Sequence, residues 1–171
     1  MPSLTAEEQD MFLDERGVLM RIGTVRADGR PLVTPIWFLC EDDAIWFTPR
    51  ERSEWFTNLR RDRRVCLAID EQNMPYRKVL VEGDAELVYD IGNDDAWRDL
   101  YRRIAGRYID AEAAEAYIQT TIEEPRGLYC VRLAEARVRS WRMPVTGEDP
   151  TGIWHRRYYR TATDRQTKAD S

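Results

Sequence analysis

The sequence predicts a mainly β fold with α-helical insertions, in which antiparallel strands form a closed or partly closed barrel. Short runs of alternating apolar and polar residues recur along the chain, as expected for strands with one buried face. Tight turns separate most of these runs, and helical spacing of apolar residues is confined to short segments. Six or more antiparallel strands joined by short turns are typical of a barrel and not of a parallel α/β sheet.

The expected strands are delimited by turn residues. Asp28-Gly29 and Asp42-Asp43 form tight connections between neighbouring strands, and Gly83 marks a β-bulge in the longest one. Pro35 lacks a backbone donor, so it requires a sheet edge, a bulge or a place where a ligand faces the backbone. The predicted strands span residues 19–26, 31–40, 44–49, 64–70, 78–89, 128–133 and 136–141.

Helices are expected where capping residues precede apolar residues at helical spacing. Thr5 and Glu8 have the spacing of a capping box, and Ser53 can cap a second helix. The predicted helices span residues 5–16, 54–61, 94–105 and 111–121. We therefore expect one domain over residues 1–145, which includes the N-terminal helix and a helical insertion at 94–121, followed by a tail over 146–171.

Composition excludes several classes of function. The 171 residues carry a formal net charge of −5, which argues against an obligate nucleic-acid binder. No apolar run is long enough to cross a bilayer, and the first residues do not resemble a signal peptide, so a soluble cytoplasmic protein without membrane contacts is expected.

Few residues are suited to metal or covalent chemistry. Cys40, Cys66 and Cys130 stand singly in apolar runs, and His155 is the only histidine, so no metal site and no serine–histidine–acid triad is predicted. Lys78 and Lys168 are the only lysines among 26 basic residues, which favours arginine for anion recognition. The catalytic residues stay unknown at this point.

Four segments together resemble a known family. These are Asp28-Gly-Arg-Pro-Leu-Val-Thr-Pro-Ile-Trp-Phe38, Ile45-Trp-Phe-Thr48, Ser53 with Asn58 and Leu59 downstream, and Val81-Glu-Gly-Asp-Ala85. This order resembles the pyridoxamine 5′-phosphate oxidase-like family of FMN-binding split β-barrels, especially its branch of flavin- and deazaflavin-dependent reductases. The resemblance covers about residues 5 to 141. It implies a homodimer with FMN, or alternatively a deazaflavin coenzyme, bound in clefts at the interface.

The residues of these segments suit the parts of a flavin mononucleotide. Arg50 and Arg52 precede a helix whose N-terminus begins at Ser53, and guanidinium groups with free helix amides favour a phosphate dianion. Backbone groups beside Pro35 can reach the polar edge of the flavin ring, and tryptophans can form the walls of its slot. The residues expected to contact the cofactor are Thr34, Pro35, Ile36, Trp37, Thr48, Pro49, Arg50, Arg52, Ser53, Trp55 and Trp141.

The chain departs from the family pattern at one position. Many members have a lysine two residues after the serine equivalent to Ser53, whereas this chain has Trp55. Either Arg50 or Arg52 replaces its charge, the cofactor follows another path, or affinity has been lost. The leading hypothesis is an FMN-dependent oxidoreductase that exchanges hydride with a small organic substrate. The alternatives are a deazaflavin-dependent reductase, a non-catalytic flavin- or haem-binding module, and a structural homodimer.

Overall fold

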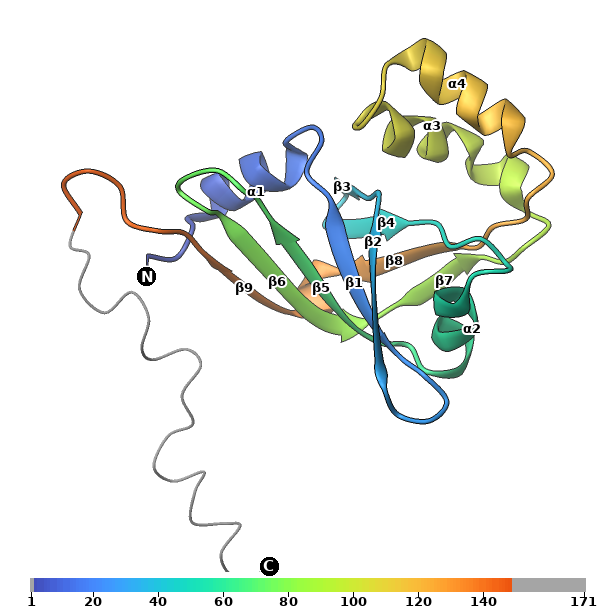
Figure 1. The fold of residues 1–171 in the computed structure, drawn as a ribbon, viewed down its shortest axis with the longest axis horizontal. Coiled ribbons are helices and arrows are strands. Elements are labelled where there is room, and N and C mark those ends of the chain that lie inside the picture. The colour runs from blue at the N-terminus through green and yellow to red at the C-terminus, as the bar shows by residue number, and fades with distance from the viewer. Residues whose placement is uncertain (1, 149–171) are drawn as a thin grey trace, which may run out of the picture.

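The structure, a computed structural model, describes residues 2–148 and consists mainly of antiparallel β-sheet with short helices (Figure 1). The predicted fold class is therefore confirmed at this level. Most of the predicted tail, beyond residue 148, lies outside the described residues. No helix among residues 2–148 combines the length and apolar character needed to span a bilayer.

Two antiparallel sheets form the body of the molecule. The first has the order β2-β1-β5-β6-β9 and the second the order β3-β4-β8-β7. The strands of the first sheet are β1 Met20–Val25, β2 Pro31–Ile36, β5 Arg64–Asp70, β6 Lys78–Asp84 and β9 Arg137–Trp141. Those of the second are β3 Leu39–Glu41, β4 Ala44–Phe47, β7 Glu86–Tyr89 and β8 Leu128–Arg132.

The predicted barrel is not closed. Over residues 2–148 no strand pairing joins one sheet to the other. The two longest predicted strands are each interrupted, 31–40 between Ile36 and Leu39 and 78–89 at Ala85, and there the chain leaves one sheet for the other. Ala85 is fully buried at this corner, and its amide donates to the carbonyl oxygen of Arg63 at 2.8 Å. Because the residue at such a corner is as buried as the inward-facing residues of the strands, the apolar–polar alternation of the sequence continues across it and does not mark the change of sheet.

Gly83 does not form the predicted bulge. It pairs with Val65 in an uninterrupted ladder between β5 and β6. A Cβ atom at Gly83 would lie 3.1 Å from the Cβ of Ala136 and 3.4 Å from Cγ1 of Val131. Glycine is therefore needed here because the two sheets approach closely, and not because the strand bends.

The predicted turns are present. Asp42 and Asp43 both have a φ of 53°, which is the left-handed conformation required at both centres of a type I′ turn. Gly29 has a φ of 84° in the connection between β1 and β2.

The main core lies between the two sheets and beneath α1 (Ala6–Asp14). Thr5 and Glu8 form the predicted capping box at the start of α1. Fully buried side chains come from α1 and from both sheets: Phe12, Leu13, Met20, Ile22, Ile45, Phe47, Leu67, Ile69, Val81, Tyr129 and Val131. Each such apolar side chain contributes roughly 1.5–3 kcal/mol through burial.

A separate helical layer covers the end of the second sheet (Figure 1). It comprises a 3₁₀ turn η1 (Asp94–Trp97), α3 (Arg98–Gly106) and α4 (Ala111–Thr120), so the predicted 94–105 helix begins with a 3₁₀ turn. Another 3₁₀ turn, η2 (Leu133–Glu135), connects β8 to β9. Leu39 and Leu128 of the sheet join Trp97, Tyr101, Ile104 and Ile118 in a second apolar cluster.

Arg107 and Tyr108 attach this layer to the β2–β3 connection. The Arg107 guanidinium donates to the carbonyl oxygens of Phe38 at 2.9 Å and Leu13 at 2.6 Å. The Tyr108 hydroxyl accepts from the Phe38 amide at 3.1 Å and donates to the Val18 carbonyl at 2.9 Å. These bonds fix the helical layer beside the end of β2.

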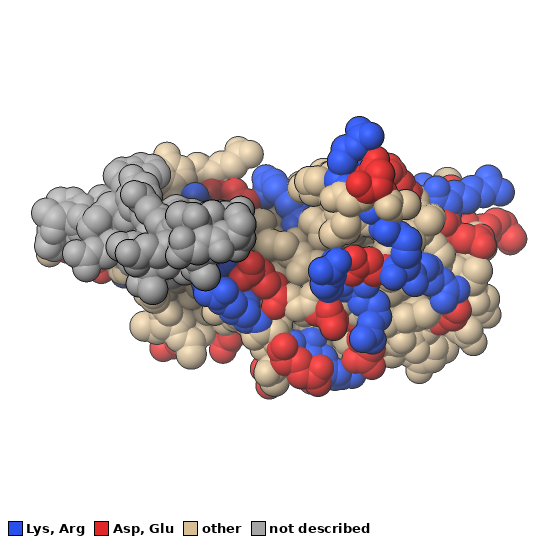
Figure 2. Space-filling model, turned by 90° about the horizontal axis from the view of Figure 1, so that it is seen from below, with Lys and Arg blue, Asp and Glu red and all other residues tan. Residues whose placement is uncertain are grey.

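Surface charges of opposite sign are interspersed. On the face seen in Figure 2, basic side chains lie beside acidic ones. The arginine-rich segment after α2 (Glu54–Arg61) follows the same pattern, since Arg60 pairs with Asp90 at 2.8 Å and Arg64 with Asp62 at 2.7 Å. The arginines at this helix end are therefore exposed and largely paired with acidic side chains.

Candidate functional site

One pocket of about 330 Å³ brings together most of the residues predicted to contact a cofactor. It lies between the end of β2, the β4–α2 connection and the helical layer. Its lining comprises eight of the predicted residues, Thr34, Pro35, Ile36, Trp37, Thr48, Arg50, Ser53 and Trp55, and four others, Tyr101, Ile104, Tyr117 and Arg126. The volume is at the lower end of the range for small-molecule sites, about 300–1,000 Å³.

The first wall is an exposed sheet edge. Among residues 2–148, β2 pairs only with β1, and Pro35 lies opposite Arg21 in that ladder. In an antiparallel ladder, every second residue of a strand bonds to its neighbour strand, and the residues between point their backbone groups away. The Arg26 amide donates to the Arg30 carbonyl, so Thr34 is a residue whose backbone groups face β1, and those of Pro35 point away from β1. The missing donor of Pro35 therefore leaves no gap in the ladder, as the predicted edge position requires.

The second wall is the connection between β4 and α2. Ser53 caps α2, because its Oγ accepts from the Phe56 amide at 3.3 Å and donates to the Arg50 carbonyl at 2.7 Å. Arg50 donates through Nη2 to the Tyr117 hydroxyl at 2.9 Å and pairs through Nη1 with Glu124 at 2.8 Å. The N-terminus of α2 and one guanidinium thus border the same pocket.

The third wall is the helical layer. The ring of Trp37 stacks on Tyr108 with a centroid distance of 5.1 Å and an interplanar angle of 4°, and it contacts Tyr117 at 5.4 Å. Tyr101 and Tyr117 come from α3 and α4, and Arg126 from the segment that precedes β8. None of these three residues was predicted from the sequence: helical spacing places Tyr101 and Tyr117 on a buried face without showing which part borders a pocket, and Arg126 lies in a segment without a regular pattern.

The two tyrosines of this wall differ in their ionisation. Burial raises the pKa of Tyr101, so its phenol keeps its proton. Burial alone would raise the pKa of Tyr117 as well, but the neighbouring Tyr101, Arg50 and Arg126 side chains outweigh it and hold this pKa below its ordinary value. The pocket therefore stabilises negative charge on an oxygen atom beside Arg50.

Three predicted contact residues do not line this pocket. Pro49 is buried, and its carbonyl accepts from the Gly127 amide at 3.1 Å, so it fixes the loop. Arg52 is exposed and lines an adjacent depression with Glu51 and Glu123. Trp141 is only 7% exposed and lies on β9, at the opposite edge of the sheet from β2. Within one chain it is too distant to form the predicted wall.

Trp55 belongs partly to the core. Its ring lies 6.0 Å from that of Phe47, and the side chain packs against the main apolar cluster while it borders the pocket. Among residues 2–148, Trp37 and Trp55 are the tryptophans that line this pocket and can contact a planar ligand. Asn58, which the family pattern includes, is structural: its buried amide donates to Thr24 Oγ1 at 3.1 Å.

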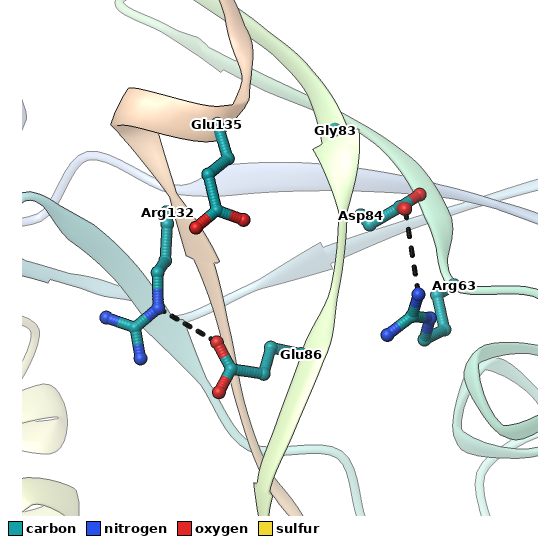
Figure 3. Close-up of a pocket in the computed structure, with 6 residues that line it drawn as sticks. All are labelled: Arg63, Gly83, Asp84, Glu86, Arg132 and Glu135. Carbon is teal, nitrogen blue, oxygen red and sulfur yellow. Dashed lines mark hydrogen bonds and ion pairs between the residues drawn. The ribbon is translucent and has the colours of Figure 1, made fainter.

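A larger pocket of about 450 Å³ lies elsewhere, at the transition from β6 to β7 (Figure 3). Its lining residues form two ion pairs, Arg132–Glu86 at 2.9 Å and Arg63–Asp84 at 3.9 Å. None of the predicted contact residues borders it. The described part of the chain also contains no cluster of histidine, cysteine and acidic residues able to hold a metal ion.

Comparison with known proteins identifies the family. The sequence model described as pyridoxamine 5′-phosphate oxidase matches residues 5–140. The chain belongs to this family. The family resemblance expected from the sequence is thereby confirmed, and the candidate pocket of this oxidase-family chain lies wholly within the matched segment. No curated protein matches the chain.

Several solved structures share the fold. A conserved hypothetical protein from Mycobacterium tuberculosis, Rv2991, has a TM-score of 0.65 and 24% identity over 81% of this chain and 85% of its own. An F420 reductase has a TM-score of 0.54 and 25% identity over 74% and 92%. An FAD- and haem-binding protein from Mycobacterium smegmatis has a TM-score of 0.60 and 20% identity over 80% and 71%.

Proposed function

We propose that this family member is an FMN-dependent oxidoreductase that acts on a small organic substrate. The supporting observation is the convergence of β2, the β4–α2 connection and the helical layer on one pocket that carries both an aromatic slot and a cationic end. A flavin mononucleotide has the same two parts, a planar ring and a phosphate.

The pocket chemistry fits such a cofactor. Trp37 and Trp55 offer planar apolar surface, and the outward carbonyl group of Pro35 can accept a hydrogen bond from the polar edge of a flavin ring. Arg50 and the capped N-terminus of α2 favour the phosphate. When bound, the flavin supplies the hydride chemistry, and the protein orients the ring and excludes water. No general acid or nucleophile in the chain is then required.

A second copy of the chain completes the site in this proposal. Thr34, Pro35 and Ile36 of the β2 edge line the pocket of about 330 Å³, and Val33 beside them on this edge is 62% exposed. An unpaired apolar edge of this kind is a suitable surface for association. We therefore expect a homodimer with the cofactor at its interface.

The visible spectrum of the purified protein tests the proposal. The protein should carry flavin absorbance, or acquire it when FMN is added, and a nicotinamide nucleotide or another hydride donor should bleach that absorbance. Parallel titrations with a deazaflavin coenzyme, FAD and haem identify the alternatives. A protein that binds none of these four compounds would contradict the proposal, and a flavin that no biological donor reduces would favour the non-catalytic module.

A further inference from the structure

Arg126 is a buried cation that forms no ion pair among residues 2–148, although the Asp94 carboxylate accepts a hydrogen bond from its backbone amide at 3.1 Å. The residue is only 5% exposed, and no carboxylate of residues 2–148 pairs with its guanidinium group. Its Nη2 donates to Thr121 Oγ1 at 3.5 Å, and its guanidinium lies 4.8 Å from the ring centroid of Tyr101. These neutral contacts compensate a buried charge poorly, because a guanidinium out of water needs an anion to balance it.

The hydroxyl of Tyr101 is a second unsatisfied group in the same place. The oxygen is buried and makes no hydrogen bond of acceptable geometry within residues 2–148, although it lies close enough to the Tyr117 hydroxyl to affect its pKa; Tyr101 as a whole is 3% exposed. Tyr101 and Arg126 both line the pocket. Since a buried hydroxyl normally finds a partner, this one indicates an acceptor that enters the pocket from outside the chain.

The backbone brings Arg50 beside these two residues. Arg50 and Arg126 form an isolated antiparallel bridge, which hydrogen bonds from Glu51 to Pro125 and from Gly127 to Pro49 extend on either side. Glu124 forms an ion pair with Arg50 but not with Arg126. The pair of guanidiniums therefore keeps an excess of positive charge at one end of the pocket.

We propose that Arg126, Tyr101 and Arg50 form a subsite for a phosphate monoester, which receives the phosphate of FMN. This inference rests on the proposed function and adds Tyr101 of the helical layer and Arg126 of the segment before β8 to Arg50 as contacts of the phosphate. Arg126 would supply the charge that the family lysine supplies where this chain has Trp55. A guanidinium fork and a neutral phenol both donate to phosphate oxygens, and a dianion balances the buried charge.

The preference for FMN over riboflavin tests the subsite, because the two ligands share a ring and differ in the phosphate. We expect the full-length protein to bind FMN at least 100-fold more tightly than riboflavin, as measured by quenching of flavin fluorescence. Arg126→Met should reduce that preference at least 10-fold and leave riboflavin affinity unchanged. Arg103→Met removes an exposed arginine of α3 that pairs with Glu41 outside the pocket, and it should leave the preference unchanged.

Tyr101→Phe gives a second, gentler variant. It removes only the unpaired hydroxyl, so folding is preserved, and the FMN preference should fall about three- to tenfold. Arg126→Met and Tyr101→Phe proteins that both keep the full preference would overturn the inference while the proposed function stands.

Inorganic phosphate separates the two proposals if no flavin binds. Calorimetric titration of the wild-type protein with phosphate, repeated with Arg126→Met, should then show binding that only the wild-type protein retains. That result would support the subsite and reject the flavin function. Absence of phosphate binding in the wild-type protein, together with absence of flavin binding, would overturn both.

Discussion

Arg50 and Arg126 lie opposite each other in a two-residue antiparallel bridge, although 76 positions separate them in the sequence. The bridge joins the β4–α2 connection, which the family pattern includes, to a segment that the pattern does not mark. Both side chains line the same pocket, so an anion bound there would be attracted by both guanidiniums.

Arg50 and Arg52 were equal candidates for replacing the family lysine, and the structure distinguishes them. Arg50 borders the pocket, whereas Arg52 is exposed outside it. Arg50→Met should weaken FMN binding by about 1.5–3 kcal/mol, the usual contribution of a hydrogen bond to a charged group. Arg52→Met serves as the matched control and should change affinity less than twofold. Fluorescence titration measures both, and a larger loss with Arg52→Met would reverse the assignment.

Ser53 caps α2 in addition to bordering the pocket, and the two roles can be separated. Ser53→Ala removes the cap and should lower the free energy of unfolding by about 0.5–2 kcal/mol. Ser53→Asp restores a capping oxygen but places a negative charge beside the cationic end. This variant should keep its stability in urea and lose FMN affinity relative to riboflavin. Equal FMN binding by wild type and Ser53→Asp would show that the phosphate lies elsewhere.

The sequence predicts the parts of the site that belong to continuous motifs. Thr34–Trp37 follow one strand, and Arg50, Ser53 and Trp55 lie within one connection and the helix after it, so local spacing is enough to place them together. Pro35 was informative because a missing donor restricts the strand to an edge, and β2 is an edge strand among the described residues.

The remaining parts depend on contacts between distant segments. Tyr101 and Tyr117 belong to the helical layer that Arg107 and Tyr108 attach to Phe38, and a backbone bridge places Arg126 beside Arg50. The corner at Ala85 and the close approach at Gly83 arise from packing between sheets, which alternation along one strand does not encode. Trp141 lies at the opposite edge of the sheet from β2, so its predicted contact with a cofactor stays a prediction that depends on a second copy of the chain.

Tyr108 should matter for stability. Its hydroxyl satisfies the Phe38 amide and the Val18 carbonyl, so Tyr108→Phe leaves a donor and an acceptor without their partner. The free energy of unfolding should fall by about 1–3 kcal/mol, as measured by urea denaturation. Tyr76→Phe changes a tyrosine that is 41% exposed and should alter stability by less than about 0.5 kcal/mol. A Tyr108→Phe protein as stable as this control would contradict the proposed attachment.

The substitution Trp55→Lys tests whether a lysine at this position, as in many family members, can bind the phosphate. Trp55→Lys removes apolar contacts with the core and should lower stability by about 1–3 kcal/mol, whereas Trp55→Phe should lower it less. The lysine should raise FMN affinity only slightly in the wild-type background, because Arg50 and Arg126 already supply charge. In an Arg126→Met background it should restore most of the lost preference for FMN over riboflavin. Failure of this rescue would show that position 55 does not face the phosphate.

Tyr117 should make FMN binding dependent on pH. Arg50 and Arg126, together with Tyr101 from α3, hold its pKa below the ordinary value of about 10, and Trp37 packs against its ring. A bound phosphate would oppose the Tyr117 phenolate and raise this pKa. Binding is therefore strongest below the pKa of the free protein and weakens as pH rises through it.

The ratio of riboflavin to FMN dissociation constants isolates this effect, because ionisation of the flavin ring is common to both ligands. The ratio should rise between about pH 5 and 7 as the phosphate loses its second proton, whose pKa is about 6. It should then fall towards pH 10 as Tyr117 ionises. Tyr117→Phe should retain the first change and lose the second, because a phenyl ring carries no proton to release. A decline that persists unchanged in Tyr117→Phe would assign the alkaline transition to another group.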